Sequence, residues 1–414
     1  MKKILGPWII FATLGISSFN IIPHDFVAKK PAPGETFFDV KFGYAITRIS
    51  KPSNFTGRCL VPEYSKRQVF NADESWLRLQ DCDGRTLIYD AKNYQFKKIL
   101  KDEITGAQDI FWHPSLPHLL YFNTEATLKL YDINTDTITP VFAFKNSQGA
   151  PYLMADTFAE GNLSNDGRYY AVIGRMGERD FKEILVLDIF NKSLVSRRAM
   201  PAGIDFVDWV SISPLGRYVV VDYATSARGV EVYPLDLTKL LWTKPLGTGH
   251  SDLGLDADGA TEILVMDVYD SNLNKTVLKK FLLRDGQTTD LLSLGLFDLH
   301  ISCRNIKRPG WCYMSVFDMN DQQSTDAAHW DLFADEIFAL KLDGSAMKSP
   351  NGVERLAHHH SRRYGNEGVY TAEPHATVSA KGDRIVFGSN WHENIYQETS
   401  IDPYILDLRN KMPR

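Results

Sequence analysis

The sequence predicts an all-β fold, a seven-bladed β-propeller closed by an N-terminal strand. Short β-rich runs alternate with Asp, Asn, Gly and Pro turns, and no long helical periodicity occurs between residues 36 and 408. A multi-strand pattern also recurs seven times along the chain. The composition is that of a globular protein, with 414 residues, 44% hydrophobic and 23% charged. Length alone suggests two or three domains, whereas the repeat predicts one closed domain over 36–408.

The first 23 residues form a separate segment that resembles an export signal. Two lysines precede an uncharged and mostly apolar stretch from Ile4 to Ser18, followed by small residues. A membrane-spanning helix needs roughly 20 apolar residues, and Pro7 and Gly15 disfavour one here. The segment 1–23 is therefore predicted to be a signal peptide, with an uncleaved N-terminal anchor as the alternative. Both alternatives predict a secreted or periplasmic protein that meets a membrane only through this segment.

The repeat consists of a strand, a small polar turn, a second strand rich in Tyr, Val and Phe, and a third that often ends in Asp. Equivalent turn residues are 42 to 51 residues apart in five of the six intervals and 77 apart in the last. Blades of four strands normally take roughly 40–50 residues, so this spacing favours a propeller over a pair of β-sandwiches. The turn residues taken as equivalent are Asn71, His113, Ser164, Ser213, Asp256, Ser302 and Ser379.

The two ends of the repeat predict how the ring closes. The last unit offers three strands, at 376–379, 384–389 and 404–408, which is one short of a blade. An isolated strand at 42–49 could supply the fourth, and its pairing with the last unit would remove an open sheet edge.

The four cysteines fit an oxidising compartment. Cys303 and Cys312 flank a turn between two predicted strands, which predicts a disulfide, and Cys59 and Cys82 would form the second. Four buried thiols are the alternative, because spacing alone does not establish disulfide geometry.

Three histidines suggest a site at one mouth of the central channel. Residues that precede the turns start the innermost strands, so they converge there from all blades. His250, His300 and His375 precede the turns of the fifth, sixth and seventh units, and Glu373 is close to the last. Imidazoles with a carboxylate are typical transition-metal ligands, so these four predict a site for a divalent metal such as manganese, calcium or zinc. The alternative is that the histidines cap strands or bond backbone between blades.

Further polar and aromatic residues suggest an anionic or sugar-like ligand. Tyr64 and Arg67 start the first inner strand, and an arginine can hold a carboxylate while a tyrosine can exchange a proton. The run at His358–His360 leads toward the same mouth and could add a base. Solvated basic loops and core tryptophans are the alternative interpretations. The predicted catalytic residues are Tyr64, Arg67, His358 and His360, and the predicted substrate-binding residues are Arg362, Arg363 and Trp209.

Several function classes are disfavoured. The net charge is −5 and no long basic run occurs, so nucleic acid is not an expected partner. The sequence lacks a G-x-S-x-G elbow, a P-loop, an H-E-x-x-H motif and a dinucleotide fingerprint, which disfavours serine hydrolysis and phosphoryl transfer.

Three segments carry a resemblance to known propellers: YSKRQVFNADESWLRL from Tyr64, LSNDGRYYAVIG from Leu163 and EPHATVSAKGDRIVFGSNW from Glu373. They resemble the repeats of Tol-type propellers and, more narrowly, secreted oligogalacturonate-lyase-like propellers. The resemblance implies a manganese-like ion held by His250, His300 and His375, with Glu373 or Asp252 nearby. The Gln of that family's closing segment is missing here.

Two functional hypotheses follow from these patterns. The first is a polysaccharide-directed, metal-assisted lyase that cleaves uronic-acid-containing glycans by β-elimination. In it a metal or Arg67 would neutralise the uronate carboxylate. Tyr64, His358 or His360 would remove the neighbouring proton, and a phenol or imidazole would protonate the leaving oxygen. The second is a non-catalytic binding or scaffold propeller of the cell envelope, which would need no metal.

Overall fold

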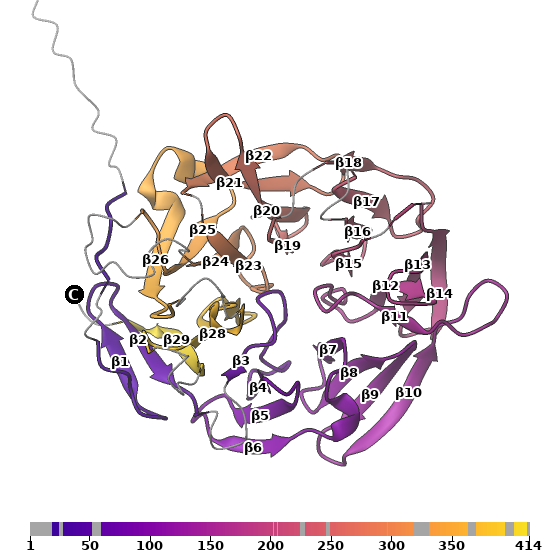
Figure 1. The fold of residues 1–414 in the computed structure, drawn as a ribbon, viewed down its shortest axis with the longest axis horizontal. Coiled ribbons are helices and arrows are strands. Elements are labelled where there is room, and N and C mark those ends of the chain that lie inside the picture. The colour runs from indigo at the N-terminus through magenta and orange to yellow at the C-terminus, as the bar shows by residue number, and fades with distance from the viewer. Residues whose placement is uncertain are drawn as a thin grey trace, which may run out of the picture.

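The computed structural model describes residues 19–24, 28–51, 59–201, 203–204, 206–223, 228–245, 249–295, 297–317, 331–362, 370–393 and 401–411. These residues form seven antiparallel sheets arranged in a ring (Figure 1). No α-helix occurs in the described part of the chain, and short 3-10 turns lie at Asp102–Ile104, Ser345–Met347, Pro350–Gly352 and Tyr370–Ala372. The predicted seven-bladed β-propeller is confirmed.

Six blades are sheets of four consecutive strands, in chain order from the centre outward. Blade 1 holds β3 (Leu60–Val61), β4 (Trp76–Asp81), β5 (Thr86–Asp90) and β6 (Phe96–Ile99). Blade 2 holds β7 (Asp109–Trp112), β8 (Leu119–Thr124), β9 (Thr127–Asp132) and β10 (Thr137–Ala143). Blade 3 holds β11 (Met154–Asp156), β12 (Tyr169–Arg175), β13 (Phe181–Asp188) and β14 (Ser193–Ala199).

The second half of the ring repeats this arrangement. Blade 4 holds β15 (Trp209–Ile212), β16 (Tyr218–Asp222), β17 (Val230–Pro234) and β18 (Trp242–Lys244). Blade 5 holds β19 (Ser251–Leu255), β20 (Glu262–Asp270), β21 (Lys275–Leu282) and β22 (Thr288–Leu294). Blade 6 holds β23 (Asp298–Ser302), β24 (Trp311–Phe317), β25 (Glu336–Lys341) and β26 (Val353–His358).

Blade 7 closes the ring with strands from both ends of the chain. Its sheet order is β1–β2–β29–β28–β27, in which β1 (Thr36–Asp39) and β2 (Tyr44–Arg48) come from the N-terminal side. The other three strands are β27 (Thr377–Val378), β28 (Arg384–Ser389) and β29 (Asp402–Lys411). Because β2 pairs with β29, the predicted closure by an N-terminal strand is confirmed, and β1 adds a fifth strand outside it.

The turn after each inner strand has a local chemical cause. In blade 3 the Ser164 hydroxyl accepts a hydrogen bond from the Tyr169 amide at 2.9 Å, and Gly167 between them adopts a left-handed φ of 71°. A residue with a Cβ adopts such a φ only under strain, so glycine favours this turn. The same bond, spanning five residues, joins Asn71 to Trp76, Ser213 to Tyr218, and Ser379 to Arg384.

The hydrophobic core lies between blades rather than at the centre of the ring. Seven clusters of buried apolar side chains each join two neighbouring blades. The cluster between blades 6 and 7 includes Ile46 of β2, which is fully buried beside Tyr404 and Leu406 of β29. The closing strand therefore contributes to the core as well as to the sheet.

Both predicted disulfides are present. Cys59 pairs with Cys82 at a Cα separation of 5.4 Å, and Cys303 pairs with Cys312 at 4.5 Å. The second bond links the end of β23 to the start of β24, so it fastens the turn of blade 6. Two such bonds fit folding in an oxidising compartment.

Blade 1 has an interruption that the repeat pattern does not predict. Val61 pairs with Gln80, and the next pairing joins Phe70 to Leu77, so residues 62–68 form a loop within the inner strand. This loop, here named the channel loop, lies at the centre of the ring (Figure 1). It bonds across the channel to blade 3 through Asn162, which donates to the Lys66 carbonyl, and to blade 7 through Thr377, which donates to the Arg67 carbonyl.

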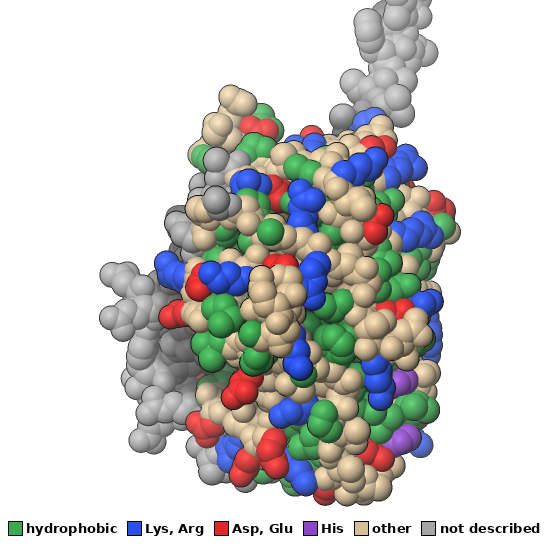
Figure 2. Space-filling model, turned by 90° about the vertical axis from the view of Figure 1, so that its right-hand side faces the viewer, with side chains coloured by type: hydrophobic (Ala, Val, Ile, Leu, Met, Phe, Trp, Pro, Cys, Tyr) green, Lys and Arg blue, Asp and Glu red, His purple; other side chains and the backbone are tan. Residues whose placement is uncertain are grey.

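The outer edge of the ring near β14 and β18 carries basic and acidic side chains side by side (Figure 2). The part of the chain described here includes no helix with the length and apolarity to cross a bilayer.

Residues 1–18 lie outside the described residues, so the export segment stays a prediction. Residues 19–23 contact blades 6 and 7: the Phe19 ring lies 5.0 Å from that of Phe333, and Lys41 donates to the Pro23 carbonyl.

Candidate metal centre and active site

Three predicted histidines meet at the mouth of the channel where the inner strands begin. His300 lies in β23, while His250 and His375 directly precede β19 and β27. The His300 ring centroid is 4.5 Å from that of His250 and 4.1 Å from that of His375. The convergence that was expected from their positions in the repeat is thus present in the structure.

Glu373 completes a compact donor set with two of these histidines. Its carboxylate lies 2.8 Å from His300 Nε2, and one ligand atom from each of His300, Glu373 and His375 lies within 4.8 Å of the others. All three residues are buried. His300 Nδ1 and His375 Nε2 are buried nitrogens with no hydrogen-bond partner among the described residues. Two imidazoles and a carboxylate with unpartnered nitrogens fit a divalent metal, although the set's role as ligands stays a prediction.

Burial keeps these imidazoles neutral, which is the form that binds metals. It lowers the pKa of His375 to about 3 and lowers that of His300 well below its ordinary value. The neighbouring histidines lower both values further, because adjacent positive charges would repel one another.

His250 has a different setting from the other two. Its Nδ1 lies 3.5 Å from the Asp298 carboxylate, and its side chain is 28% exposed, whereas His300 is buried. His250 is not part of the compact donor set. Burial lowers the pKa of His250, and the charge of Asp298 opposes that shift.

The rings of two tyrosines, Tyr64 and Tyr370, contact the rings of the same histidines. The Tyr64 ring is 5.4 Å from His300 and 5.5 Å from His375, and the Tyr370 ring is 4.6 Å from His375. A hydrogen bond joins the two phenols. Burial first, and then the charge of Glu160, raises the pKa of Tyr64 well above its ordinary value, so this phenol keeps its proton. Tyr370 was not predicted, because its short 3-10 turn carries no repeat signal.

An acidic patch faces the tyrosines from blades 3 and 4. Burial and the charge of Glu160 raise the pKa of Asp208 to about 6. Lys66 of the channel loop forms an ion pair with Glu160 at 2.5 Å and lies 4.5 Å from the Trp209 ring centroid. Lys66 therefore compensates part of the acidic charge at the mouth.

Asp252, suggested as a neighbour of the metal, has a structural partner instead. Its two carboxylate oxygens accept hydrogen bonds from the Arg304 guanidinium at 2.8 and 3.1 Å and from the Cys303 amide at 2.7 Å. Its carboxylate is thus engaged in joining blades 5 and 6.

The contacts of Arg67 contradict its predicted catalytic role, which was to neutralise the uronate carboxylate. Arg67 is fully buried in the channel loop, where its guanidinium bonds Asp109, the Thr157 hydroxyl and the carbonyls of Ala159 and Gly161. These bonds occupy its donors in joining blades 1, 2 and 3. The sequence could not show this, because the channel loop has no counterpart in the other units.

Trp209 is also not an exposed sugar-stacking residue. It is 2% exposed and packs with Val220 and Leu253 between blades 4 and 5. Lys66 of the channel loop makes a cation–π contact with its ring. Trp209 belongs to the core.

His358, His360 and Arg362 lie away from the channel. His358 ends β26, the outermost strand of blade 6, three strands from β23 and hence about 14 Å from it at normal strand spacing. The ring of His360 stacks on Trp391 at 4.2 Å, and the Arg362 backbone bonds the Asn390 side chain. These positions overturn the predicted roles of the three residues at the mouth, and Arg363 lies outside the described residues.

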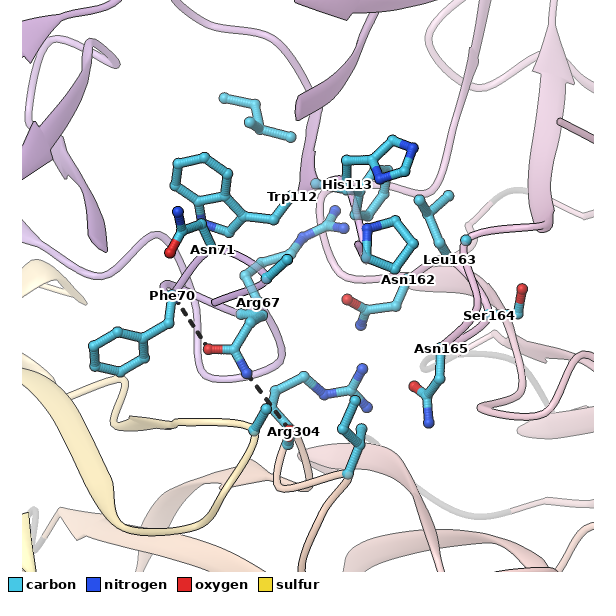
Figure 3. Close-up of a pocket in the computed structure, with 18 of the residues that line it drawn as sticks. Arg67, Phe70, Asn71, Trp112, His113, Asn162, Leu163, Ser164, Asn165 and Arg304 are labelled. Carbon is cyan, nitrogen blue, oxygen red and sulfur yellow. Dashed lines mark hydrogen bonds between the residues drawn. The ribbon is translucent and has the colours of Figure 1, made fainter. Parts of the chain in front are cut away.

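The opposite mouth holds a separate pocket, shown in Figure 3. It is lined by turn residues such as Asn71, His113 and Ser164, together with Arg67 and Arg304. Gln68 of the channel loop donates to the Arg304 carbonyl at 3.5 Å, and its carbonyl oxygen accepts from the Phe70 amide at 3.0 Å (Figure 3). The channel loop therefore lies between this pocket and the histidines.

Comparisons with known proteins reveal similarity of fold. No family model matches the chain, and no curated protein matches it by sequence. An oligogalacturonate lyase solved in complex with manganese aligns with a TM-score of 0.62 at 14% identity, covering 93% of this chain and 97% of that one. The oligogalacturonate lyase of Vibrio parahaemolyticus gives 0.60 at 14% identity, covering 91% and 98%. Kuenenia stuttgartiensis hydrazine synthase gives 0.50 at 12% identity, covering 82% and 95%.

Both alignments with the lyases cover more than nine-tenths of each chain. At 14% identity the likeness concerns the fold and does not by itself assign the chemistry. The chain is a seven-bladed β-propeller whose fold is similar to that of oligogalacturonate lyases.

Proposed function

We propose that this protein is a lyase that cleaves uronic-acid-containing glycans by β-elimination at the histidine-lined mouth. The observation that carries the proposal is the compact set of His300, Glu373 and His375 beside a phenol, Tyr64, that retains its proton. The manganese-bound oligogalacturonate lyase, which shares the fold, supports this substrate class. The two disulfides support a secreted or periplasmic location.

β-Elimination on a uronate removes the proton next to the carboxylate and breaks the bond to the glycosidic oxygen on the following carbon. The reaction needs a positive charge near the carboxylate, a base and an acid. A divalent cation held by His300, His375 and Glu373 would supply the charge and make the proton more acidic. Neutral imidazoles and one carboxylate suit manganese or zinc as that ion.

His250 is the best-placed base. It lies beside the donor set without belonging to it, its side chain is partly exposed, and Asp298 faces its Nδ1. That contact favours the tautomer with the proton on Nδ1, which leaves Nε2 to accept the substrate's proton. Tyr64 is unsuited to be the base because its pKa is raised.

Tyr64 is better suited to the opposite step. Its phenol holds a proton at neutral pH and lies against His300 and His375. Without substrate this O–H is donated to Tyr370. In the reaction it would turn to the departing glycosidic oxygen and give up its proton there.

The proposal is tested with the purified full chain and polygalacturonate, alginate and ulvan. The chain is dialysed against a chelator and then supplied with Mn²⁺, Ca²⁺ or Zn²⁺, and the absorbance of the unsaturated uronate product is recorded. We expect activity on at least one uronan that needs an added ion and is lost in His300→Ala and Glu373→Gln. His118→Ala, which changes a histidine outside the mouth, is the matched control and should retain full activity. If no uronan gives product with any ion, the lyase proposal fails and the binding or scaffold propeller becomes the better interpretation.

A further inference from the structure

A second group of histidines lies at the edge of blades 6 and 7, outside the proposed active site. One ligand atom from each of His24, His360 and His392 lies within 4.8 Å of the others. The three residues come from distant parts of the chain: the N-terminal segment, the loop after β26 and the turn after β28. The His24 ring centroid is 4.9 Å from that of His360 and 4.5 Å from that of His392. Three imidazoles thus face one point from three segments.

The second observation concerns the ring nitrogens of His360, the central histidine of this group. His360 is 1% exposed, and neither of its ring nitrogens has a hydrogen-bond partner among the described residues. A buried polar group without a partner costs free energy, typically about 1–3 kcal/mol, so such groups usually have a ligand, an ion or a water. His360 therefore points independently to an occupant between the rings.

We propose that His24, His360 and His392 form a second, structural transition-metal site, with zinc as the expected ion, that fastens the N-terminal segment to blades 6 and 7. Tetrahedral zinc with bonds of about 2.0–2.1 Å holds its nitrogens about 3.3 Å apart. Ligand atoms within 4.8 Å of one another need to move inward by only about an ångström to meet that geometry, which small ring rotations provide. A ligand set made only of imidazoles suits zinc, copper or nickel and disfavours oxygen-seeking ions such as calcium.

Neighbouring side chains and a backbone hydrogen bond hold the three rings in place. Trp391 stacks on His360 at 4.2 Å, and the His358 ring lies edge-on to His24 at 4.4 Å. The His392 amide donates to the His360 carbonyl at 2.8 Å, which holds the two ligand-bearing loops together. Burial also lowers the pKa of His392 to about 3 and that of His360 well below its ordinary value, so both rings are neutral.

The proposed ion would complete a set of contacts that already hold the N-terminal segment. Arg355 donates to the Asn20 carbonyl, and Trp391 donates to the Ala28 carbonyl at 2.9 Å. Lys30 forms ion pairs at 2.6 Å with Glu393 and Asp402. His24 follows the predicted export segment 1–23, so a metal there would bind residues 24–31 to the propeller near its closing blade whether or not that segment is removed.

The test measures metal stoichiometry in the full chain and in variants of each site. The chain is dialysed against a chelator, equilibrated with Zn²⁺, freed of excess ion and analysed by elemental mass spectrometry. His360→Asn and His392→Asn are the informative variants, because both positions have a left-handed φ, 56° and 62°, that asparagine tolerates. His118→Ala is the control.

We expect two zinc ions in the wild type and in His118→Ala, and one in each Asn variant. His300→Ala with His375→Ala should also retain one, and adding His360→Asn to that pair should leave none. If His360→Asn and His392→Asn keep the wild-type stoichiometry, the second site is overturned. A third outcome separates the two proposals. If the two Asn variants each lose one ion, the double variant His300→Ala/His375→Ala retains that ion, and the wild type cleaves no uronan, the second site stands and the lyase proposal fails.

A second measurement, the rate of proteolysis, distinguishes loss of the metal site from misfolding of the variants. Bound zinc should slow cleavage by trypsin at the exposed Lys29 of the wild type, by about tenfold at free Zn²⁺ ten times the Kd. The effect should vanish in His360→Asn while the far-ultraviolet circular dichroism stays that of the wild type. Equal cleavage rates with and without Zn²⁺ in the wild type would contradict the fastening role.

Discussion

At the scale of single residues, burial decides which polar groups are available for chemistry. Arg67 and His300 are both buried. Arg67 donates its hydrogen bonds to Asp109 and three neighbours, whereas one ring nitrogen of His300 has no partner among the residues that the structure describes. A sequence shows the identity of a polar residue but not the bonds that it makes. This is why Arg67 was predicted to be catalytic and why His300 could only be suggested as a metal ligand.

Tyr64 provides the first prediction at this scale. In Tyr64→Phe the ring contacts with His300 and His375 remain and the donated proton is lost. We expect kcat on the cleaved uronan to fall by about 10²- to 10⁴-fold with little change in KM. Steady-state kinetics checks this, and a variant with unchanged kcat would exclude Tyr64 as the acid.

Asp267 provides a second prediction at the residue scale. Burial and the charge of Asp298 raise the pKa of its carboxyl from 3.8 to about 8. Between these values the folded state keeps a proton that the unfolded state has lost, so this group's contribution to the free energy of unfolding falls as pH rises from about 4 to about 8. Asp267→Asn should flatten that slope in denaturant titrations at several pH values. Asp285→Asn, at the surface, should leave the slope as in the wild type, and a steep slope that persists in Asp267→Asn would contradict this assignment.

At the scale of elements, the repeated turns explain what the sequence revealed. The hydroxyls of Ser164, Ser213 and Ser379 accept hydrogen bonds from amides five residues further on. These bonds are local, so the sequence of such a unit indicates its own turn. The positions of His250, His300 and His375 followed from counting back from such turns. The channel loop at 62–68 breaks the pattern in blade 1 alone, and its contacts with blades 3 and 7 are long-range. Local patterns could not predict them.

The channel loop yields a prediction about stability. Arg67→Met would leave the Asp109 carboxylate buried without its ionic partner, and such a loss typically costs about 3–5 kcal/mol. We expect a fall of that size in the free energy of unfolding by urea. Arg284→Met, which breaks an exposed pair with Asp285, should cost less than about 1 kcal/mol. Equal effects of the two variants would show that the loop is not fastened by this bond.

At the scale of the whole molecule, the ring is closed by chain ends that lie far apart in sequence. The pairing of β2 with β29 was predicted because the last unit lacks a strand and an isolated strand occurs near the start. The extra strand β1 and the contacts of residues 19–31 with blades 6 and 7 were not predicted, because that region carries no repeat. The pairings of β1 with β2 and of β2 with β29, here named the seam, therefore contribute to the stability of the whole ring.

The seam is tested with Ile46, a fully buried residue of β2 between blades 6 and 7. Ile46→Ala removes core volume and should lower the free energy of unfolding by about 2–5 kcal/mol. Hydrogen exchange should accelerate first in β2 and β29, since they share this side chain's contacts. Exchange that accelerates evenly around the ring would contradict a local role for the seam.

Diffraction is the decisive test of the proposed ion at the histidine-lined mouth. Crystals grown with Mn²⁺ would be measured at the manganese absorption edge, and an anomalous difference map would locate the ion. The account predicts a peak within bonding distance, roughly 2.0–2.3 Å, of His300, Glu373 and His375. A map with no peak among these three side chains would contradict it.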